Sequence, residues 1–77
     1  MKTFVQLKLF ATLANHTPEN ADRYPVSPGS TIKNLLDSLN IPLSEAKLIF
    51  VNNVRVGPEA VIFGGERIGI FPPVGGG

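Results

Sequence analysis

The chain contains no cysteine among its 77 residues. Without a thiol it cannot form a disulfide, a thiolate zinc site or an iron–sulfur cluster, and it has no cysteine nucleophile. If the protein handles sulfur, the sulfur is not carried by a thiol of its own. A chain of this length forms one domain that buries about 60% of its unfolded surface, so packing alone must stabilise the fold.

Charge is scarce and balanced. Seven Lys and Arg residues stand against six Asp and Glu residues, which gives a formal charge of +1. This balance gives no electrostatic reason to expect binding to nucleic acid or to an anionic membrane. No segment approaches the roughly 18 apolar residues of a membrane span, and the N-terminus lacks the features of a signal peptide. We therefore expect a cytoplasmic protein.

Two features that could indicate a small-molecule site are better explained structurally. The single histidine, His16, lies in a polar stretch that we interpret as a loop, with an exposed imidazole and no metal partner. Gly64-Gly65 lacks the Lys-Ser/Thr, the GxGxxG spacing and the following helix of a phosphate-binding loop. We expect no metal site, and we interpret the glycine pair as a turn between strands.

The first part of the chain predicts two strands and a helix. Residues 3–10 alternate, with Val5, Leu7 and Leu9 on the face expected to be core, and residues 11–21 read as a long polar connection. Residues 22–27 predict a weaker strand, which Pro25 places at a sheet edge. A helix over residues 32–39 follows, with Thr31 as its N-cap and an apolar stripe formed by Ile32, Leu35, Leu36 and Leu39.

The second part predicts three more strands. Residues 47–51 and 54–56 form a hairpin through Asn52-Asn53, since Asn tolerates the positive φ of a tight turn. Residues 60–63 are interpreted as a short apolar plug, and residues 66–71 as a final strand with Ile68 and Ile70 facing the core. The resulting β-β-α-β-β-β order predicts an α+β fold of the β-grasp type. In it a mixed sheet of four to five strands packs on one main helix, and the first and last strands pair in parallel.

The most informative segment is the last one. Pro72 and Pro73 fix φ and remove backbone donors, so residues 72–77 should leave a domain of residues 1–71 as a stiff, then flexible, tail. Glycines without Cβ can thread a narrow channel and bring a terminal carboxylate to a foreign active site. Phe10 and Phe71 lie on the non-core face of adjacent strands and could form an apolar partner surface beside the root of the tail.

These segments carry a family resemblance. The chain resembles the ubiquitin-like sulfur carriers of the MoaD/ThiS group, and more closely the MoaD branch, the small subunits of molybdopterin synthase. The specific match is the terminal Phe-Pro-Pro-Val-Gly-Gly-Gly segment, and the supporting matches are residues 9–11, 29–32, 35–36, 50–53 and 65–67. The chain departs from the family in having Asn53 in place of the usual Gly, Gly75 in place of Ala or Ser, and no basic residues in the connection after residue 11.

The resemblance implies chemistry at Gly77. An adenylating enzyme related to ubiquitin-activating enzymes would use ATP to join AMP to the Gly77 carboxylate, and sulfur from a donor would replace AMP. The thiocarboxylate would then enter the large subunit of molybdopterin synthase and supply sulfur to a pterin precursor. The chain would be a carrier with no bound cofactor and no catalytic side chain of its own. The residues that thread the channel would be Pro72, Pro73, Val74, Gly75 and Gly76.

Other functions remain open at the level of sequence. A sulfur carrier for thiamin thiazole synthesis would use the same chemistry, although its family members are typically shorter and lack the Phe-Pro-Pro-Val segment. A protein modifier would be ligated through Gly77 to lysines of its targets. A non-covalent β-grasp interaction module would not need Gly77 at all. The choice between molybdenum and tungsten is likewise left open.

Overall fold

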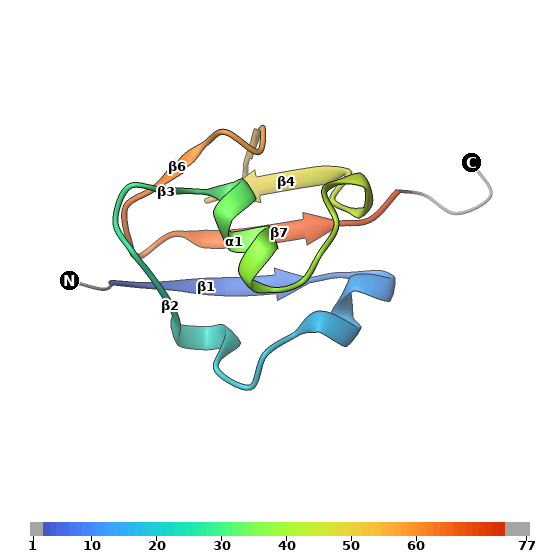
Figure 1. The fold of residues 1–77 in the computed structure, drawn as a ribbon, viewed down its shortest axis with the longest axis horizontal. Helices are drawn as coiled ribbons and strands as arrows, with labels where there is room; N and C mark the ends of the chain where they lie inside the picture. The colour runs from blue at the N-terminus through green and yellow to red at the C-terminus, as the bar shows by residue number, and fades with distance from the viewer. Residues whose placement is uncertain (1–2, 74–77) are drawn as a thin grey trace.

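Five strands form one mixed sheet in the spatial order β2-β1-β7-β4-β5 (Figure 1). The computed structural model describes residues 3–73, so the expectations for Val74, Gly75, Gly76 and Gly77 lie outside the described residues. The central strands β1 and β7 pair in parallel, and the other neighbours pair antiparallel. The strands are β1 (Thr3–Leu9), β2 (Tyr24–Val26), β4 (Leu48–Val51), β5 (Val54–Val56) and β7 (Arg67–Phe71). This is the β-grasp arrangement that the sequence predicts.

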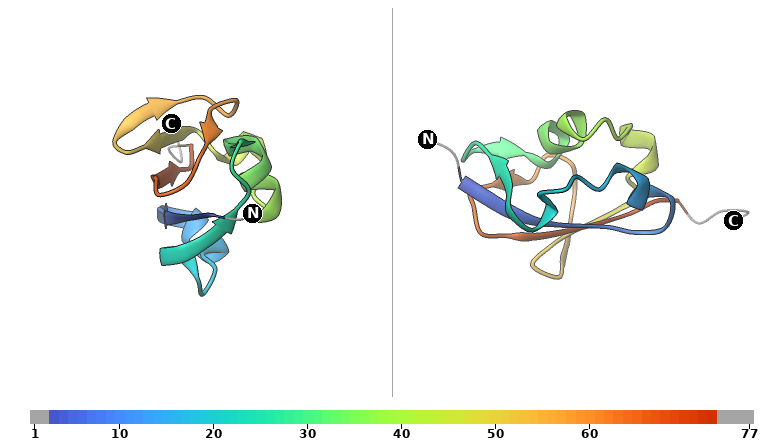
Figure 2. Two further views of the ribbon diagram at one scale, coloured as in Figure 1. Left: turned by 90° about the vertical axis from the view of Figure 1, so that its left-hand side faces the viewer. Right: turned by 90° about the horizontal axis from the view of Figure 1, so that it is seen from below.

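One face of the sheet is covered by the helix α1 (Ile32–Ser38), as the views in Figure 2 show. A separate two-stranded sheet, β3 (Ser30–Thr31) with β6 (Val61–Ile62), lies beside it. Three short 3-10 helices complete the layer, and they are η1 (Ala11–His16), η2 (Ala21–Arg23) and η3 (Leu43–Glu45). Within residues 3–73, no helix is long and apolar enough to cross a bilayer.

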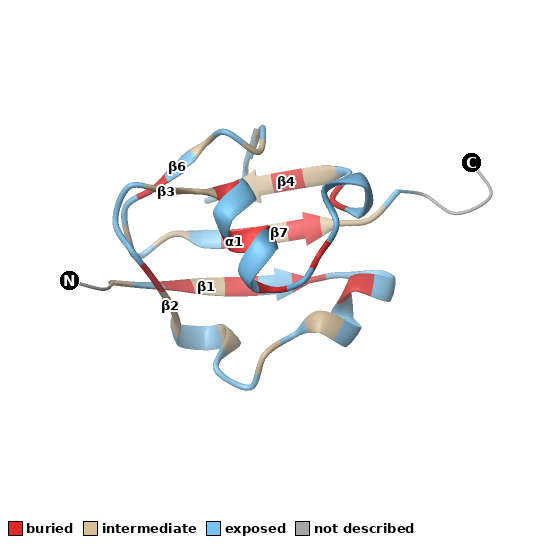
Figure 3. Ribbon diagram, in the orientation of Figure 1, coloured by how far each residue is buried: buried red, intermediate tan, exposed pale blue. Residues whose placement is uncertain are grey.

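The core lies between α1 and the sheet (Figure 3). Because side chains alternate along a strand, β1 buries the three residues expected from its pattern, and β7 buries Ile68 and Ile70 completely. The parallel register places Leu7 beside Ile68 and Leu9 beside Ile70, which makes one continuous apolar layer. The helix contributes the apolar stripe formed by Ile32, Leu35, Leu36 and Leu39.

The helix begins at a capping box. The backbone N–H of Asn34 donates to the Thr31 hydroxyl (3.2 Å), and the backbone N–H of Thr31 donates to the Asn34 side chain (3.0 Å). Thr31 is therefore the N-cap that the sequence predicts, and Asn34 completes it. At the other end Asn40 takes a left-handed φ of 60° and Pro42 follows, so the helix ends within two turns.

Two predicted turns are confirmed, one by its backbone angles and the other by its hydrogen bonds. Asn52 and Asn53 have φ values of 52° and 70°, as a two-residue hairpin of the primed type requires. At the second turn the Glu66 carboxylate accepts hydrogen bonds from the backbone N–H of Phe63 (2.8 Å) and of Gly64 (2.7 Å). These amides are thus satisfied by the chain itself, in agreement with a turn rather than a phosphate-binding loop.

The structure corrects the expectation for residues 11–21. This connection is not simply a polar loop, because η1 and η2 fold it against the edge of the core, and Leu13 is completely buried. The entry to η1 depends on Ala11, whose φ of 52° is unusual for a residue with a Cβ. His16, expected to be exposed, ends η1 and is half-buried.

A second correction concerns the predicted plug at residues 60–63. Only Ile62 in this segment is fully buried, whereas Phe63 is 69% exposed and Val61 is 45% exposed. The reason is the period of two along β6, which turns the neighbours of Ile62 toward solvent. The segment closes the core with one side chain and pairs with β3 through its backbone.

Candidate functional site at the root of the tail

The last strand is held on both sides up to its final residue. The backbone N–H of Phe10 donates to the Ile70 carbonyl (3.1 Å), and the backbone N–H of Lys47 donates to the Phe71 carbonyl (2.9 Å). Pro72, which follows, is half-buried, and Pro73 is exposed. The chain therefore leaves the sheet at a fixed point, because the backbone of Phe71 is held by its neighbours, and the φ of Pro72 restricts the first step beyond it.

An aromatic cluster surrounds this exit point. The rings of Phe10 and Phe71 are stacked, with centroids 4.1 Å apart and an interplanar angle of 0°. Phe50 meets the Phe71 ring edge-on, at 5.8 Å and 83°. Such pairs contribute about 0.5–1.5 kcal/mol each beyond their burial. The sequence predicts that Phe10 and Phe71 share the non-core face of adjacent strands, and the structure places their rings together on that face. Their role as a partner surface stays a prediction.

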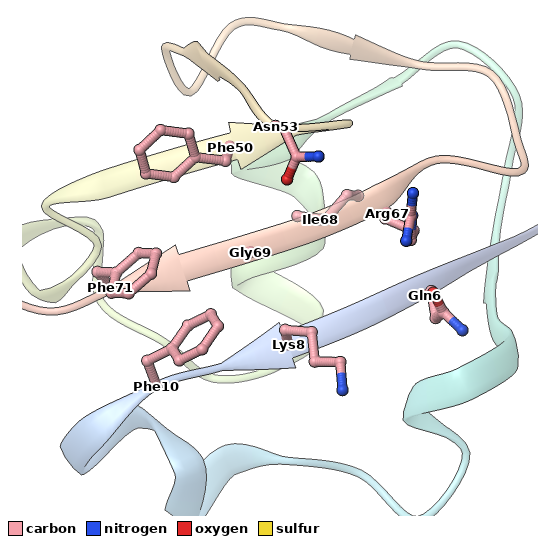
Figure 4. A pocket seen from close by; sticks show the side chains of 9 residues that line it. All are labelled: Gln6, Lys8, Phe10, Phe50, Asn53, Arg67, Ile68, Gly69 and Phe71. Atoms are coloured by element: carbon pink, nitrogen blue, oxygen red, sulfur yellow. The ribbon is translucent and has the colours of Figure 1, made fainter.

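The cluster forms one end of a hollow of about 400 Å³ on the face of the sheet opposite α1 (Figure 4). Gly69 lies in the middle of this hollow, between the aromatic end and a polar end. Lys8, Arg67, Gln6 and Asn53 line the polar end. A Cβ on Gly69 would lie 3.5 Å from the Phe10 ring, so the missing side chain leaves the ring room to lie over the strand.

Sequence reasoning did not assign Phe50, Gly69, Lys8 or Arg67 to a site. The signal was present in part, since Lys8 shares the outer face of its strand with Phe10, and Gly69 shares that of Phe71. The sequence does not show which residues of neighbouring strands lie opposite one another, and the strand register in the structure does. This register places Gly69 opposite Lys8 on β1 and opposite Phe50 on β4.

The charged side chains are distributed unevenly between the strands and the rest of the chain. All six carboxylates lie outside the strands, in helices or connections, at Glu19, Asp22, Asp37, Glu45, Glu59 and Glu66. Three cations, Lys8, Arg55 and Arg67, lie on strands at positions that face away from α1, since they share the parity of Phe50 and Phe71. The outer face of the sheet is therefore apolar at the root of the tail and basic beyond it.

No group of three or more His, Cys, Asp or Glu side chains that could hold a metal ion occurs within residues 3–73. The described part of the site consists of aromatic rings, two cations, two amide side chains and the backbone of Gly69. Rings, amide side chains and cations can hold a bound group by apolar contact, hydrogen bonding and charge.

Comparison with solved structures supports the fold. The chain is similar to the HVO 2177 protein of Haloferax volcanii at 23% identity and a TM-score of 0.73, over 99% of this chain and 88% of that one. SAMP1 from Haloferax volcanii is 22% identical with a TM-score of 0.68, and each chain is covered in full. A Pyrococcus furiosus protein assigned as molybdopterin converting factor, subunit 1, is 20% identical with a TM-score of 0.64, over 94% and 99%.

Comparison with curated proteins gives no match. Comparison with family models does give one, because the model described as Mut7-C ubiquitin matches residues 1–75. That match covers almost the whole chain, and the similar structures have the same β-grasp fold. The resemblance to ubiquitin-like proteins is thus confirmed at the level of family and fold, and the chain belongs to the Mut7-C ubiquitin family.

Proposed function

We propose that this protein is a sulfur carrier whose reactive group is the carboxylate of Gly77. In the first step the carboxylate attacks the α-phosphate of ATP on an adenylating enzyme, which forms an acyl adenylate and releases pyrophosphate. In the second step a sulfur nucleophile attacks the carbonyl carbon, the bond to AMP breaks, and a thiocarboxylate remains. Activation is needed because a carboxylate is a poor electrophile until its oxygen becomes part of a good leaving group.

The observation that carries the proposal is the aromatic cluster at the exit of the tail. Phe71 is the last residue of the sheet, its ring is stacked on Phe10, and Pro72 and Pro73 follow directly. An apolar surface beside a stiff exit lets a partner bind the body of the domain while the segment ending in Gly77 enters the partner's active site. The chain supplies the acyl group and, after loading, the sulfur nucleophile.

The pathway proposed for the loaded carrier is molybdopterin synthesis, with the large subunit of molybdopterin synthase as the acceptor of the tail. The support is the Phe-Pro-Pro-Val segment before the glycines, together with the fold shared with the Pyrococcus furiosus protein. In this role the carrier binds no cofactor itself, and ATP is consumed by the activating enzyme. We propose a cytoplasmic location, where these small-molecule reactions and their ATP supply would be found.

Intact-mass analysis tests the proposal. The protein is incubated with an adenylating enzyme, ATP and hydrosulfide, and we expect the mass change of one oxygen replaced by sulfur, located in the C-terminal peptide at Gly77. A chain whose Gly77 carboxylate is blocked as an amide is the matched control and should stay unchanged. Sulfur bound elsewhere, or no change with several such enzymes, would contradict the carrier function. Conjugates with lysines of other proteins would instead assign the chain as a modifier.

A further inference from the structure

Gly69 occupies a socket on the outer face of the sheet. Its neighbours on this face are Lys8 on β1, Phe50 on β4, and Arg67 and Phe71 two positions away on β7 itself. All four carry large side chains, so the missing side chain of Gly69 leaves a depression, and the Phe10 ring forms its wall on the tail side, 3.5 Å from where a Cβ on Gly69 would lie. Neighbouring strands lie about 4.8 Å apart, and same-face residues of one strand lie about 7 Å apart. An opening of this size accepts one side chain from a partner.

The two ends of the socket differ in chemistry. Toward the tail it is closed by the stacked rings of Phe10 and Phe71 and by Phe50. Lys8 stands beside Gly69 on β1, and Arg67 stands toward the other end, where its backbone N–H donates to the Asn52 side chain (2.9 Å). The strands that form the face carry no carboxylate. A bound group is therefore apolar in the centre and negatively charged on the side away from the tail.

We propose that this socket docks an acidic protein segment which inserts one apolar side chain over Gly69 and places carboxylates against Lys8 and Arg67. This inference rests on the proposed function, because it identifies the acidic segment as part of the partner that receives the tail. Charge complementarity selects the occupant. A second copy of the chain would oppose its own basic face, and like charges facing each other oppose association.

An NMR titration with synthetic peptides tests the docking site on the whole chain. The probe is a short peptide with a central phenylalanine flanked by glutamates. One control peptide has alanine at the centre, and a second has lysines in place of the glutamates. We expect saturable shifts of the backbone amides of Lys8, Arg67, Gly69 and Phe71 with the probe, and roughly ten-fold weaker binding of each control peptide. Added salt should weaken the binding of the probe.

Two substitutions separate docking from folding. Gly69→Val fills the socket with a residue that favours strands, and Gly69 has no positive φ that a side chain would strain. We expect binding of the probe to fall about ten-fold or more while the variant stays folded, because the added Cβ would only reach van der Waals contact with the Phe10 ring. Lys8→Glu should weaken binding about ten-fold, whereas Lys33→Glu makes the same charge change on exposed α1 and should leave it unchanged.

Several outcomes would overturn the docking site. These are the absence of saturable shifts, shifts spread over other surfaces, equal binding of the lysine peptide, or unchanged binding by a folded Gly69→Val variant. Shifts that depend on protein concentration without peptide would assign the face to self-association instead. Sulfur loading at Gly77 is scored separately by mass. Loading without docking overturns this inference alone, and docking without loading overturns the proposed function alone.

Discussion

The ring of Phe10 lies parallel to the ring of Phe71 at a centroid distance of 4.1 Å, although the two residues come from opposite ends of the chain. Phe10 directly follows β1, and Phe71 is the last residue of β7. The parallel pairing of these strands brings both rings to the same end of the sheet. The stack thus couples the residue before the tail to the opposite end of the sequence.

Phe71→Ala removes this stack and the edge contact with Phe50. We expect affinity for the large subunit of molybdopterin synthase to weaken by about 1–3 kcal/mol, the usual effect of truncating an aromatic anchor. Stability should fall by about 1–2 kcal/mol without loss of the fold, because the ring lies on the outer face. Calorimetric titration and a melting curve measure the two effects. Phe63→Ala is the control, since this ring is 69% exposed and lies outside the cluster. Unchanged affinity of the Phe71 variant would place that residue outside the interface.

Gly76→Val and Gly77→Val test whether the tail enters a narrow channel. A branched side chain restricts the backbone and adds bulk, so product formation in a reconstituted synthase assay should be lost. The free energy of unfolding should change by no more than about 0.5 kcal/mol, because the sheet ends at Phe71. Val74→Ala shortens a side chain in the same tail and should retain most of the activity. Near-normal turnover in the glycine variants would show that the tail takes no part in the reaction.

The two asparagines of the β4–β5 hairpin should respond in opposite directions to glycine. Asn53→Gly removes the strain of a left-handed φ and should be neutral or stabilising by up to about 1 kcal/mol. Asn52→Gly relieves similar strain but also removes the side-chain oxygen that accepts from the Arg67 N–H, so a net loss of about 1 kcal/mol is expected. Chemical denaturation of both variants measures the difference. Equal effects would mean that the Asn52 hydrogen bond does not stabilise the fold.

Gly64 should tolerate no side chain. Its φ of 136° is a glycine conformation, and a Cβ would collide with the side chain of Thr3. We expect Gly64→Ala to destabilise the domain by about 1–3 kcal/mol. Combining it with Thr3→Ala should recover only the part due to the collision. Gly65→Ala, at a φ of 84° with open space around it, is the milder control. A Gly64→Ala variant as stable as the Gly65→Ala variant would contradict the collision.

The sequence correctly predicts those features of the fold that a single strand or helix determines by itself. Alternation in residues 3–10 identifies the core face of β1, and Thr31, Asn40 and Pro42 mark the ends of the helix because capping is local chemistry. Leu13 was missed because the turn that buries it begins at Ala11. A positive φ is usually found at glycine or asparagine and rarely at alanine. The residue type at position 11 therefore gives no indication of the turn.

The site could be predicted only in part, because it depends on strand register. Phe10 and Phe71 follow from parity, whereas the position of Gly69 between Lys8 and Phe50 requires two pairings between distant segments. The charge distribution was hidden for a similar reason. A formal charge of +1 gives no sign that the carboxylates lie off the strands while Lys8 and Arg67 share one face.

The central place of β7 also affects how the protein is made. β7 lies between β1 and β4, so until Phe71 has been synthesised the sheet has a gap in its middle and two unpaired edges. A growing chain that stops earlier cannot close its core and remains a substrate for proteases. Only chains that have been translated at least through Phe71 can therefore complete the sheet. Truncated chains that lack Phe71 would therefore be degraded before they could accumulate.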